Sequence, residues 1–145
     1  MEYQKHIRTD EENNVFLHRT HTSLVDAIMR EGLGCCAGDL LGTATWQPSD
    51  LENAEGLYRQ THKGNNAVVV IKIPTSRIKE IPKSSRNSIA TVKGIGYFHP
   101  NRAEFTIRPE FVDGWINRET DAYTPNPYEN RKPVEGYEQF EDMFD

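Results

Sequence analysis

Cysteine is scarce in this 145-residue sequence: there are only two, Cys35 and Cys36, and they are adjacent. Neighbouring cysteines rarely meet the geometry of a disulfide, and there is no third cysteine to pair with either of them. The scarcity excludes a small scaffold held together by disulfides. The pair is typical of small buried side chains in a reducing compartment.

Long hydrophobic runs are also missing. No stretch approaches the ~20 apolar residues that a membrane-spanning helix needs. Residues 1–10 lack the apolar segment of a secretory signal peptide. We therefore expect a protein without a membrane-bound part, located in the cytoplasm. Export by a signal-independent route stays open.

Motifs that mark several enzyme classes are absent. The sequence contains no P-loop and no Gly-x-Ser-x-Gly nucleophile elbow. It has no HExxH helix, no paired CxxC motif and no close carboxylate–histidine pattern, so we expect no metal site. The histidines weighed for such a site are His6, His18, His21, His62 and His99.

An excess of basic residues is missing as well. The net charge of −5 comes from residues 119–145, with eight acidic and two basic residues, whereas residues 1–118 carry fourteen acidic and fifteen basic ones. Non-specific nucleic-acid binding depends on clustered basic residues, so charge does not favour it here. We expect one domain over residues 1–120, followed by an acidic, proline-containing tail over residues 121–145 that is disordered or lies on the surface.

Hydrophobic patterns and turn residues predict an α+β domain. The continuous apolar run at residues 67–73 is typical of a central strand buried on both faces. The residues before position 15 are expected to form a short strand or an arm. The predicted helices span residues 23–31 and residues 51–64, and the other predicted strands span residues 15–17, 43–46, 88–92, 95–98 and 104–107, followed by a turn and renewed pairing over residues 109–116.

Local signals define the helix at residues 23–31. Ser23 and Asp26 have the spacing of a capping box, and Arg30 lies in the last turn, where a cation is favourable. Gly32 can take the left-handed position that ends a helix.

The strand before this helix ends in polar residues. The apolar run Val15–Leu17 leads into His18 and Thr20, which share a face if the strand continues through residue 20. A polar pair at a strand end suits a ligand better than a core. His21 either lines the same pocket or flanks the start of the helix.

A carboxylate opens a late strand. Glu104 begins the alternating segment that ends at Ile107, and a Pro109-Glu110-Phe111 turn follows. Glu110 is the second candidate carboxylate, although the turn at Pro109 is expected to expose it.

These segments resemble the ADP-ribosyltransferase superfamily. The string His18-x-Thr20-His21, with Glu31-Gly32-Leu33 closing the helix, is most similar to the DNA thymidine ADP-ribosyltransferase toxins. It is less similar to the poly-ADP-ribose polymerases and the tRNA 2′-phosphotransferases. The segment from Glu104 to Gly114 is similar to the last motif of the superfamily. The resemblance implies a split β-sandwich with a central cleft and short helices.

The resemblance also implies roles for individual residues, with NAD as co-substrate and no metal. NAD cleavage passes through an oxocarbenium-like cation, which a nearby carboxylate stabilises. Glu104 would be that catalytic carboxylate. The residues implied to hold the nicotinamide–ribose half of NAD are His18, Arg19, Thr20, Thr45 and Tyr58, with plain core packing as the alternative for Tyr58.

The loop before Glu104 faces the acceptor in this family. Tyr97 and Phe98 would stack on a base or a side chain of the acceptor, or are ordinary strand aromatics. Arg102 stands where arginine-modifying members carry Glu or Gln, which argues against arginine as the acceptor.

The function implied is that of a toxin-like mono-ADP-ribosyltransferase acting on a protein or a nucleic acid, with a neutralising partner as an open question. The first alternative is a catalytically inactive module on the same fold that binds a nucleotide or a protein. The second is an RNA 2′-phosphotransferase, which needs basic groups around a phosphate. Arg19 and Arg102 alone do not make such a cluster.

Overall fold

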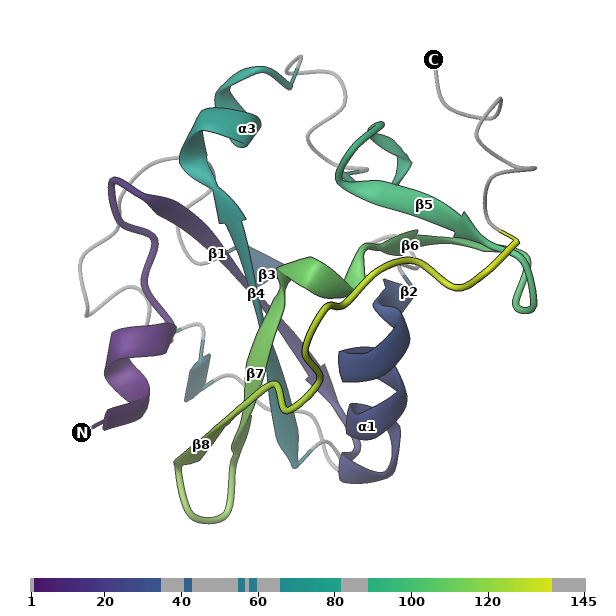
Figure 1. Ribbon diagram of the computed structural model, residues 1–145. Helices are drawn as coiled ribbons and strands as arrows, with labels where there is room; N and C mark the ends of the chain where they lie inside the picture. Colours follow the sequence, from purple (N-terminus) through teal and green to yellow (C-terminus); the bar gives the residue numbers. More distant parts are fainter. Residues whose placement is uncertain are drawn as a thin grey trace.

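The computed structural model describes residues 2–34, 41–42, 55–56, 58–59, 66–81 and 89–136. These residues form an α+β fold, in which strands outnumber the short helices and belong to two antiparallel sheets (Figure 1). The α+β class expected from the sequence is therefore confirmed. In the described part of the chain, no helix is long and apolar enough to span a membrane.

The described strands pair in two separate sheets. In the main sheet the strand order is β3-β1-β4-β7-β8, and in the smaller sheet it is β2-β6-β5. The main sheet comprises β1 (Asn13–Thr20), β3 (Leu41–Gly42), β4 (Ala67–Pro74), β7 (Val112–Asn117) and β8 (Ala122–Pro125). The smaller sheet comprises β2 (Leu33–Gly34), β5 (Gly96–His99) and β6 (Glu104–Ile107).

Short helices connect and cover the sheets. They are the 3-10 helices η1 (Glu2–His6), η3 (Ile89–Thr91) and η4 (Pro109–Phe111), and the α-helices α1 (Thr22–Glu31) and α3 (Thr75–Lys79). Residues 55–56 and 58–59 are also helical, as expected for a helix beginning near residue 51. The expected strand at residues 43–46 lies outside the described residues.

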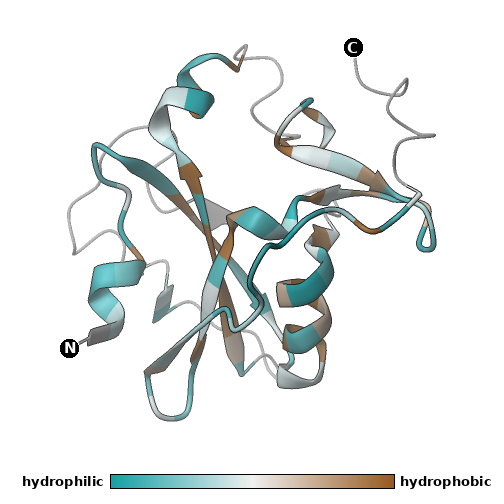
Figure 2. Cartoon of the chain, viewed as in Figure 1, coloured by the Kyte–Doolittle hydropathy of each residue, from teal (hydrophilic) through white to brown (hydrophobic). Residues whose placement is uncertain are grey.

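Strand β4 is the central strand that its continuous apolar run predicts. It pairs with β1 on one side and β7 on the other, and most of its side chains are buried. Alternate residues point to opposite faces, so Val69 and Ile71 join one hydrophobic cluster while Val68 and Val70 join another. Figure 2 shows this strand among the most hydrophobic segments of the chain.

The two clusters cover opposite faces of the main sheet. The first packs α1, the smaller sheet, η3 and η4 against it; representative members are Phe16, Ile28, Ile89, Ile107 and Phe111. The second lies under η1 and the helical residue Tyr58; representative members are Tyr3, Leu17, Tyr58 and Ile116. Each face of the main sheet is therefore buried, and a residue's place on β1 decides which cluster it joins.

Helix α1 forms where expected but is capped differently. It starts at Thr22, one residue earlier, and the N-cap is His21, whose Nδ1 accepts the N–H of Ser23 at 3.2 Å. The expected capping box of Ser23 and Asp26 is therefore wrong, because Ser23 already lies inside the first turn. The carboxylate of Asp26 instead accepts a hydrogen bond from Arg30 at 2.6 Å.

Gly32 ends the helix with a φ of 101° and a ψ of 173°. The positive φ was expected, but the ψ is extended rather than left-handed helical, a combination that only glycine adopts readily. A Cβ at this position would lie 2.1 Å from the backbone oxygen of Ile107 in β6. The helix thus ends where the chain must pass close to the smaller sheet.

The late strands form as expected. Residues 104–107 form β6, β5 lies within one residue of the expected span, and η4 is a short turn followed by the pairing strand β7. Two other expectations are wrong. Residues 89–91 form η3 rather than a strand, since the backbone turns tightly enough for Gly96 to pack against Ala90. Residues 2–6 form η1 rather than a short strand or an arm.

The described part of the C-terminal segment, residues 121–136, lies against the domain. It begins with β8, which pairs with β7, and then crosses α1 toward the smaller sheet (yellow in Figure 1). Asn126 Nδ2 donates to the backbone oxygens of Met29 and Val112, each at 2.9 Å. Arg131 Nε donates to the backbone oxygen of Pro109 at 2.9 Å. Residues 137–145 of the expected tail lie outside the described residues.

Candidate functional site

Strand β1 carries His18 and Thr20 on one face. The strand continues through residue 20, and His18 and Thr20 lie opposite Val69 and Ala67 of β4. Both β4 residues belong to the first cluster, so His18 and Thr20 face the side of α1 and the smaller sheet. The imidazole of His18 is half-buried and Thr20 is buried.

Arg19 lies on the opposite face of the same strand. Its partner on β4 is Val68, which belongs to the second cluster. The structure therefore does not bring the Arg19 side chain together with those of His18 and Thr20. Their sequence positions were consecutive, but a strand sends consecutive side chains to opposite faces.

Tyr58 also lies on that opposite face and packs as a core residue. It is 1% exposed, and its ring stacks on that of Tyr3 with centroids 4.6 Å apart. Its hydroxyl donates to Asp121 Oδ1 at 2.6 Å, and the guanidinium carbon of Arg118 lies 4.4 Å from the ring centroid. Burial, reinforced by the Asp121 carboxylate, raises the pKa of Tyr58 far above its ordinary value.

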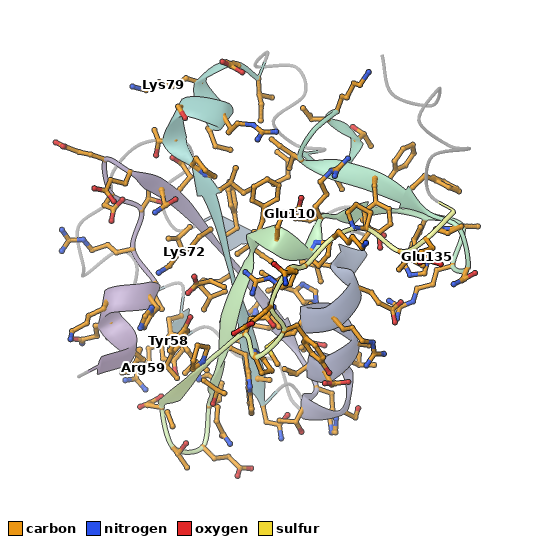
Figure 3. All side chains as sticks on the ribbon, in the orientation of Figure 1. Tyr58, Arg59, Lys72, Lys79, Glu110 and Glu135 are labelled. Carbon is orange, nitrogen blue, oxygen red and sulfur yellow. The ribbon has the colours of Figure 1, made fainter. Side chains whose placement is uncertain are left out.

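Figure 3 places Tyr58 and Arg59 beside η1, well away from Glu110. Because Tyr58 packs on the face of the main sheet opposite His18, the structure does not bring the two side chains together, and it supports the core-packing alternative. Thr45, the other residue expected in the nicotinamide pocket, lies outside the described residues.

Glu104 opens β6 and lies over a glycine. A Cβ built on Gly34 would lie 2.1 Å from Glu104 Oε1 and 2.7 Å from Cδ, so the carboxylate occupies the space that a side chain at position 34 would take. Glu104 is half-buried. Within the described ranges, no side chain forms a hydrogen bond or an ion pair with this carboxylate. A carboxylate with no partner among the described side chains is available to accept a hydrogen bond from a substrate.

Glu110, the second candidate, lies in a different environment. It is exposed on η4, and Arg108 Nη1 lies 3.7 Å from its Oε2. The expected exposure after Pro109 is confirmed. A solvent-exposed, paired carboxylate is less suited to stabilise a developing cation than the half-buried Glu104, which has no partner among the described side chains.

The residues expected to face the acceptor are mostly turned inward. Tyr97 is fully buried in β5, and its hydroxyl donates to the backbone oxygen of Glu31 at 2.6 Å. Burial raises the pKa of Tyr97 to about 12. Of the two alternatives for Tyr97, its burial fits the ordinary strand aromatic and not a ring that stacks on an acceptor. Phe98 is half-buried in the same strand. Its ring lies edge-to-face against the ring of Phe105, with the centroids 5.2 Å apart, as in an ordinary strand aromatic.

Arg102 is exposed, and its Nη2 lies 3.4 Å from Glu31 Oε1.

Sequence reasoning missed a partly buried polar pair, Glu31 and His99, beside Glu104. His99 is 1% exposed, and its Nε2 lies 2.7 Å from Glu31 Oε1. Its Nδ1 accepts the backbone N–H groups of Asn101 and Arg102, each at 3.2 Å. Nδ1 thus accepts, and Nε2 carries the proton and donates to Glu31. The only sequence signal was that Glu31 closes the helix of the motif that resembles the superfamily, whereas His99 stood out only as one of the histidines weighed for a metal site.

The environment of Glu31 favours its ionised form. Burial alone would raise the pKa of the carboxyl group, but hydrogen bonds from His99 and Arg30 and the charge of Arg102 outweigh it. The pKa of Glu31 is therefore held below its usual range. Glu31 is the last residue of α1, so this anion ties the end of the helix to the smaller sheet.

One continuous segment joins the two halves of the candidate site. Strand β1 with His18 leads directly into α1, and α1 leads into β2, whose Gly34 contacts the Glu104 carboxylate. Among the described His, Cys, Asp and Glu side chains, no three are grouped so that they could hold a metal ion. Comparison with protein-family models, with curated proteins and with solved structures gives no match.

Proposed function

We propose that this chain is an NAD-dependent mono-ADP-ribosyltransferase that transfers ADP-ribose to a macromolecular acceptor. The proposal includes the split β-sandwich of that superfamily, with NAD bound between the two sheets. The two antiparallel sheets and the short helices support it. The resemblance of residues 15–33 and 103–116 to the superfamily's first and last motifs is its second support.

The observation that carries the proposal is the state of Glu104. A half-buried carboxylate lies over a glycine, and no described side chain pairs with it. The strand with His18 and Thr20 reaches this glycine through a single helix. A half-buried carboxylate that no described side chain engages is available to accept a hydrogen bond from a ribose hydroxyl of the substrate.

The proposed reaction needs a carboxylate near the ribose and polar groups that orient NAD. In the transfer, the bond between the ribose C1′ and the nicotinamide nitrogen breaks and its electron pair leaves with nicotinamide. The acceptor's nucleophilic atom then bonds to C1′ and loses its proton. Glu104 would accept a hydrogen bond from a ribose hydroxyl and stabilise the cationic centre, while His18 and Thr20 would orient the nicotinamide–ribose half.

The acceptor is proposed only as a class, a protein or a nucleic acid, and the protein is proposed to act in the cytoplasm. Arg102 does not match the residue that arginine-modifying members carry, so the acceptor group is proposed to be something other than arginine. A neutralising partner would accompany a toxic activity.

A catalytically inactive binding module is the second candidate. The position of Tyr58 favours it, because Tyr3 and Arg118 cover a ring that was expected to line the nicotinamide pocket. RNA 2′-phosphotransfer has less support, since Arg19 faces away from His18 and Arg102 is directed to Glu31.

Incubation with NAD labelled in the nicotinamide or in the adenylate, together with cell lysate, separates these candidates. The enzyme would release nicotinamide and label an acceptor, and Glu104→Gln would abolish both. Glu110→Gln tests the second carboxylate, and Glu80→Gln, on an exposed residue after α3, serves as control. Full turnover in Glu104→Gln would refute the role of Glu104, whereas binding of NAD without any release would favour the binding module.

A further inference from the structure

A partly buried contact between Glu31 and His99 joins two distant segments of the chain. The residues are 68 positions apart, and the Nε2–Oε1 distance is 2.7 Å. Glu31 ends α1, and His99 ends β5. His99 is almost completely buried and the Glu31 side chain is 21% exposed, so the hydrogen bond is shielded from water on its His99 side.

His99 also fastens the turn that leads into β6. Its Nδ1 accepts the N–H groups of Asn101 and Arg102, and its backbone oxygen accepts the N–H of Ala103 at 2.8 Å. Ala103 has a φ of 52°, a conformation that most residues avoid unless the surroundings enforce it. Since both ring nitrogens are engaged, the imidazole is not free to move a substrate's proton.

The turn held in this way determines where Glu104 begins. Glu104 follows Ala103 directly, and His99 and Glu104 are partners across β5 and β6. Partner residues of an antiparallel pair have Cβ atoms about 5 Å apart on the same face. On the other side of the contact, Glu31 precedes Gly34 by three residues, and Gly34 lies beneath the Glu104 carboxylate.

We propose that Glu31 and His99 are positioning residues, which together hold the Glu104 carboxylate over Gly34 and in register with the helix that follows the His18 strand. This proposal rests on the proposed function, because it concerns the carboxylate assigned there to catalysis. In this proposal neither Glu31 nor His99 touches the substrate. They affect the rate of the reaction only by fixing the position of the Glu104 carboxylate.

Four variants separate the parts of this contact. Glu31→Ala removes the acceptor, whereas Glu31→Gln keeps an oxygen that accepts from His99. His99→Asn keeps an oxygen near the place of Nδ1 for the turn but loses the donor to Glu31. His99→Gln keeps an amide donor near the place of Nε2 but loses the acceptor for the turn. Glu80→Ala removes an exposed carboxylate that also lies at the C-terminal end of a helix, and is the matched control.

Two measurements are made on each full-length variant. The first is nicotinamide release from NAD, analysed as kcat and KM. The second is amide hydrogen exchange over residues 99–104, which reports the turn whether or not the protein is active. Glu31→Ala and His99→Asn should each lower kcat by about 10- to 100-fold, as expected for a small displacement of a reacting group, with KM little changed. Both should also accelerate exchange.

Glu31→Gln should recover kcat to within about threefold of the unsubstituted protein, because the hydrogen bond from His99 is kept. The double variant Glu31→Ala/His99→Asn should be no slower than either single variant, since both remove one contact. Glu80→Ala should change neither measurement.

Unchanged exchange in Glu31→Ala would overturn the proposal whatever the activity. Faster exchange with unchanged kcat would also overturn it, leaving a contact that serves only stability. If the unsubstituted protein released no nicotinamide, the proposed function itself would fail and the positioning role with it. The exchange data would then still show separately whether the contact holds the turn.

Discussion

The carboxylate of Glu104 occupies the space above Gly34 that a side chain at position 34 would fill, since a Cβ there would lie 2.1 Å from Oε1. The relationship joins the strand that carries the proposed catalytic acid to the segment that begins with His18. A larger residue at position 34 would displace the Glu104 carboxylate, which is the end of a flexible side chain. Such a substitution should therefore affect activity without a matching loss of stability.

Gly34→Ala should therefore reduce activity more than stability. The added methyl group would push the Glu104 carboxylate aside, and we expect nicotinamide release to fall about 10-fold or more while the free energy of unfolding changes by less than about 1 kcal/mol. Urea unfolding and steady-state kinetics measure the two effects. Gly56→Ala is the control, because a Cβ at Gly56 meets nothing within 4 Å. A fully active Gly34→Ala protein would contradict the assigned place of Glu104.

Gly32→Ala should do the opposite and destabilise the fold. The φ of 101° is strained for alanine, and the added Cβ would meet the Ile107 backbone oxygen at 2.1 Å, where nothing can swing away. We expect Gly32→Ala to lower the free energy of unfolding by about 2 kcal/mol or more. Denaturant unfolding monitored by circular dichroism measures this free energy. If Gly32→Ala lost as little unfolding free energy as Gly56→Ala, α1 would be able to end without the backbone conformation of Gly32.

Tyr58 should behave as a core residue. Tyr58→Phe removes only the hydrogen bond to Asp121 and should cost about 1 kcal/mol of unfolding free energy, while Tyr58→Ala should cost about 3 kcal/mol or more. In the phenylalanine variant the KM for NAD should stay unchanged, since Tyr58 lies on the face opposite His18. A large rise in KM without a loss of stability would return Tyr58 to the nicotinamide pocket.

Glu31 should contribute to acid sensitivity. Although burial alone would raise its pKa, the contacts with His99, Arg30 and Arg102 hold the pKa of Glu31 below its usual range in the folded protein. A lowered folded pKa means that the ionised group stabilises the fold at pH values above the unfolded pKa of about 4.3, and that this contribution is lost as pH falls through the folded pKa.

Glu31→Gln should consequently lose less stability than the unsubstituted protein when the pH is lowered from about 6 to about 3. The free energy of unfolding measured by urea titration at several pH values tests this. If the free energy of unfolding changed with pH in the same way in both proteins, the contacts of Glu31 would not favour its ionised form.

Much of the fold could be predicted because its signals are local. The apolar run of β4 requires burial on both faces, and the apolar stripe of α1 (Val25, Ile28 and Met29) requires one buried side. Errors arose where local signals compete: Ser23 and His21 are both able to cap α1, and residues 89–91 have a strand-like composition but must reverse the chain before β5.

The candidate site was less predictable because its geometry is not local. The expected grouping of Arg19 and Tyr58 with His18 failed because the sheet has two buried faces, and nothing in the sequence shows which face a helix covers. The contact between Glu31 and His99 links segments 68 positions apart, and neither residue alone stands out. The exposure of Glu110, by contrast, followed from the adjacent Pro109.

A crystal structure of the protein soaked with NAD tests the central claim most directly. The account predicts nicotinamide–ribose density between the β1 strand and β6, with a ribose hydroxyl within hydrogen-bond distance of the Glu104 carboxylate and the His18 side chain against the same half of the molecule. Bound NAD that contacts neither of these side chains, or a site that stays empty at saturating NAD, would contradict it.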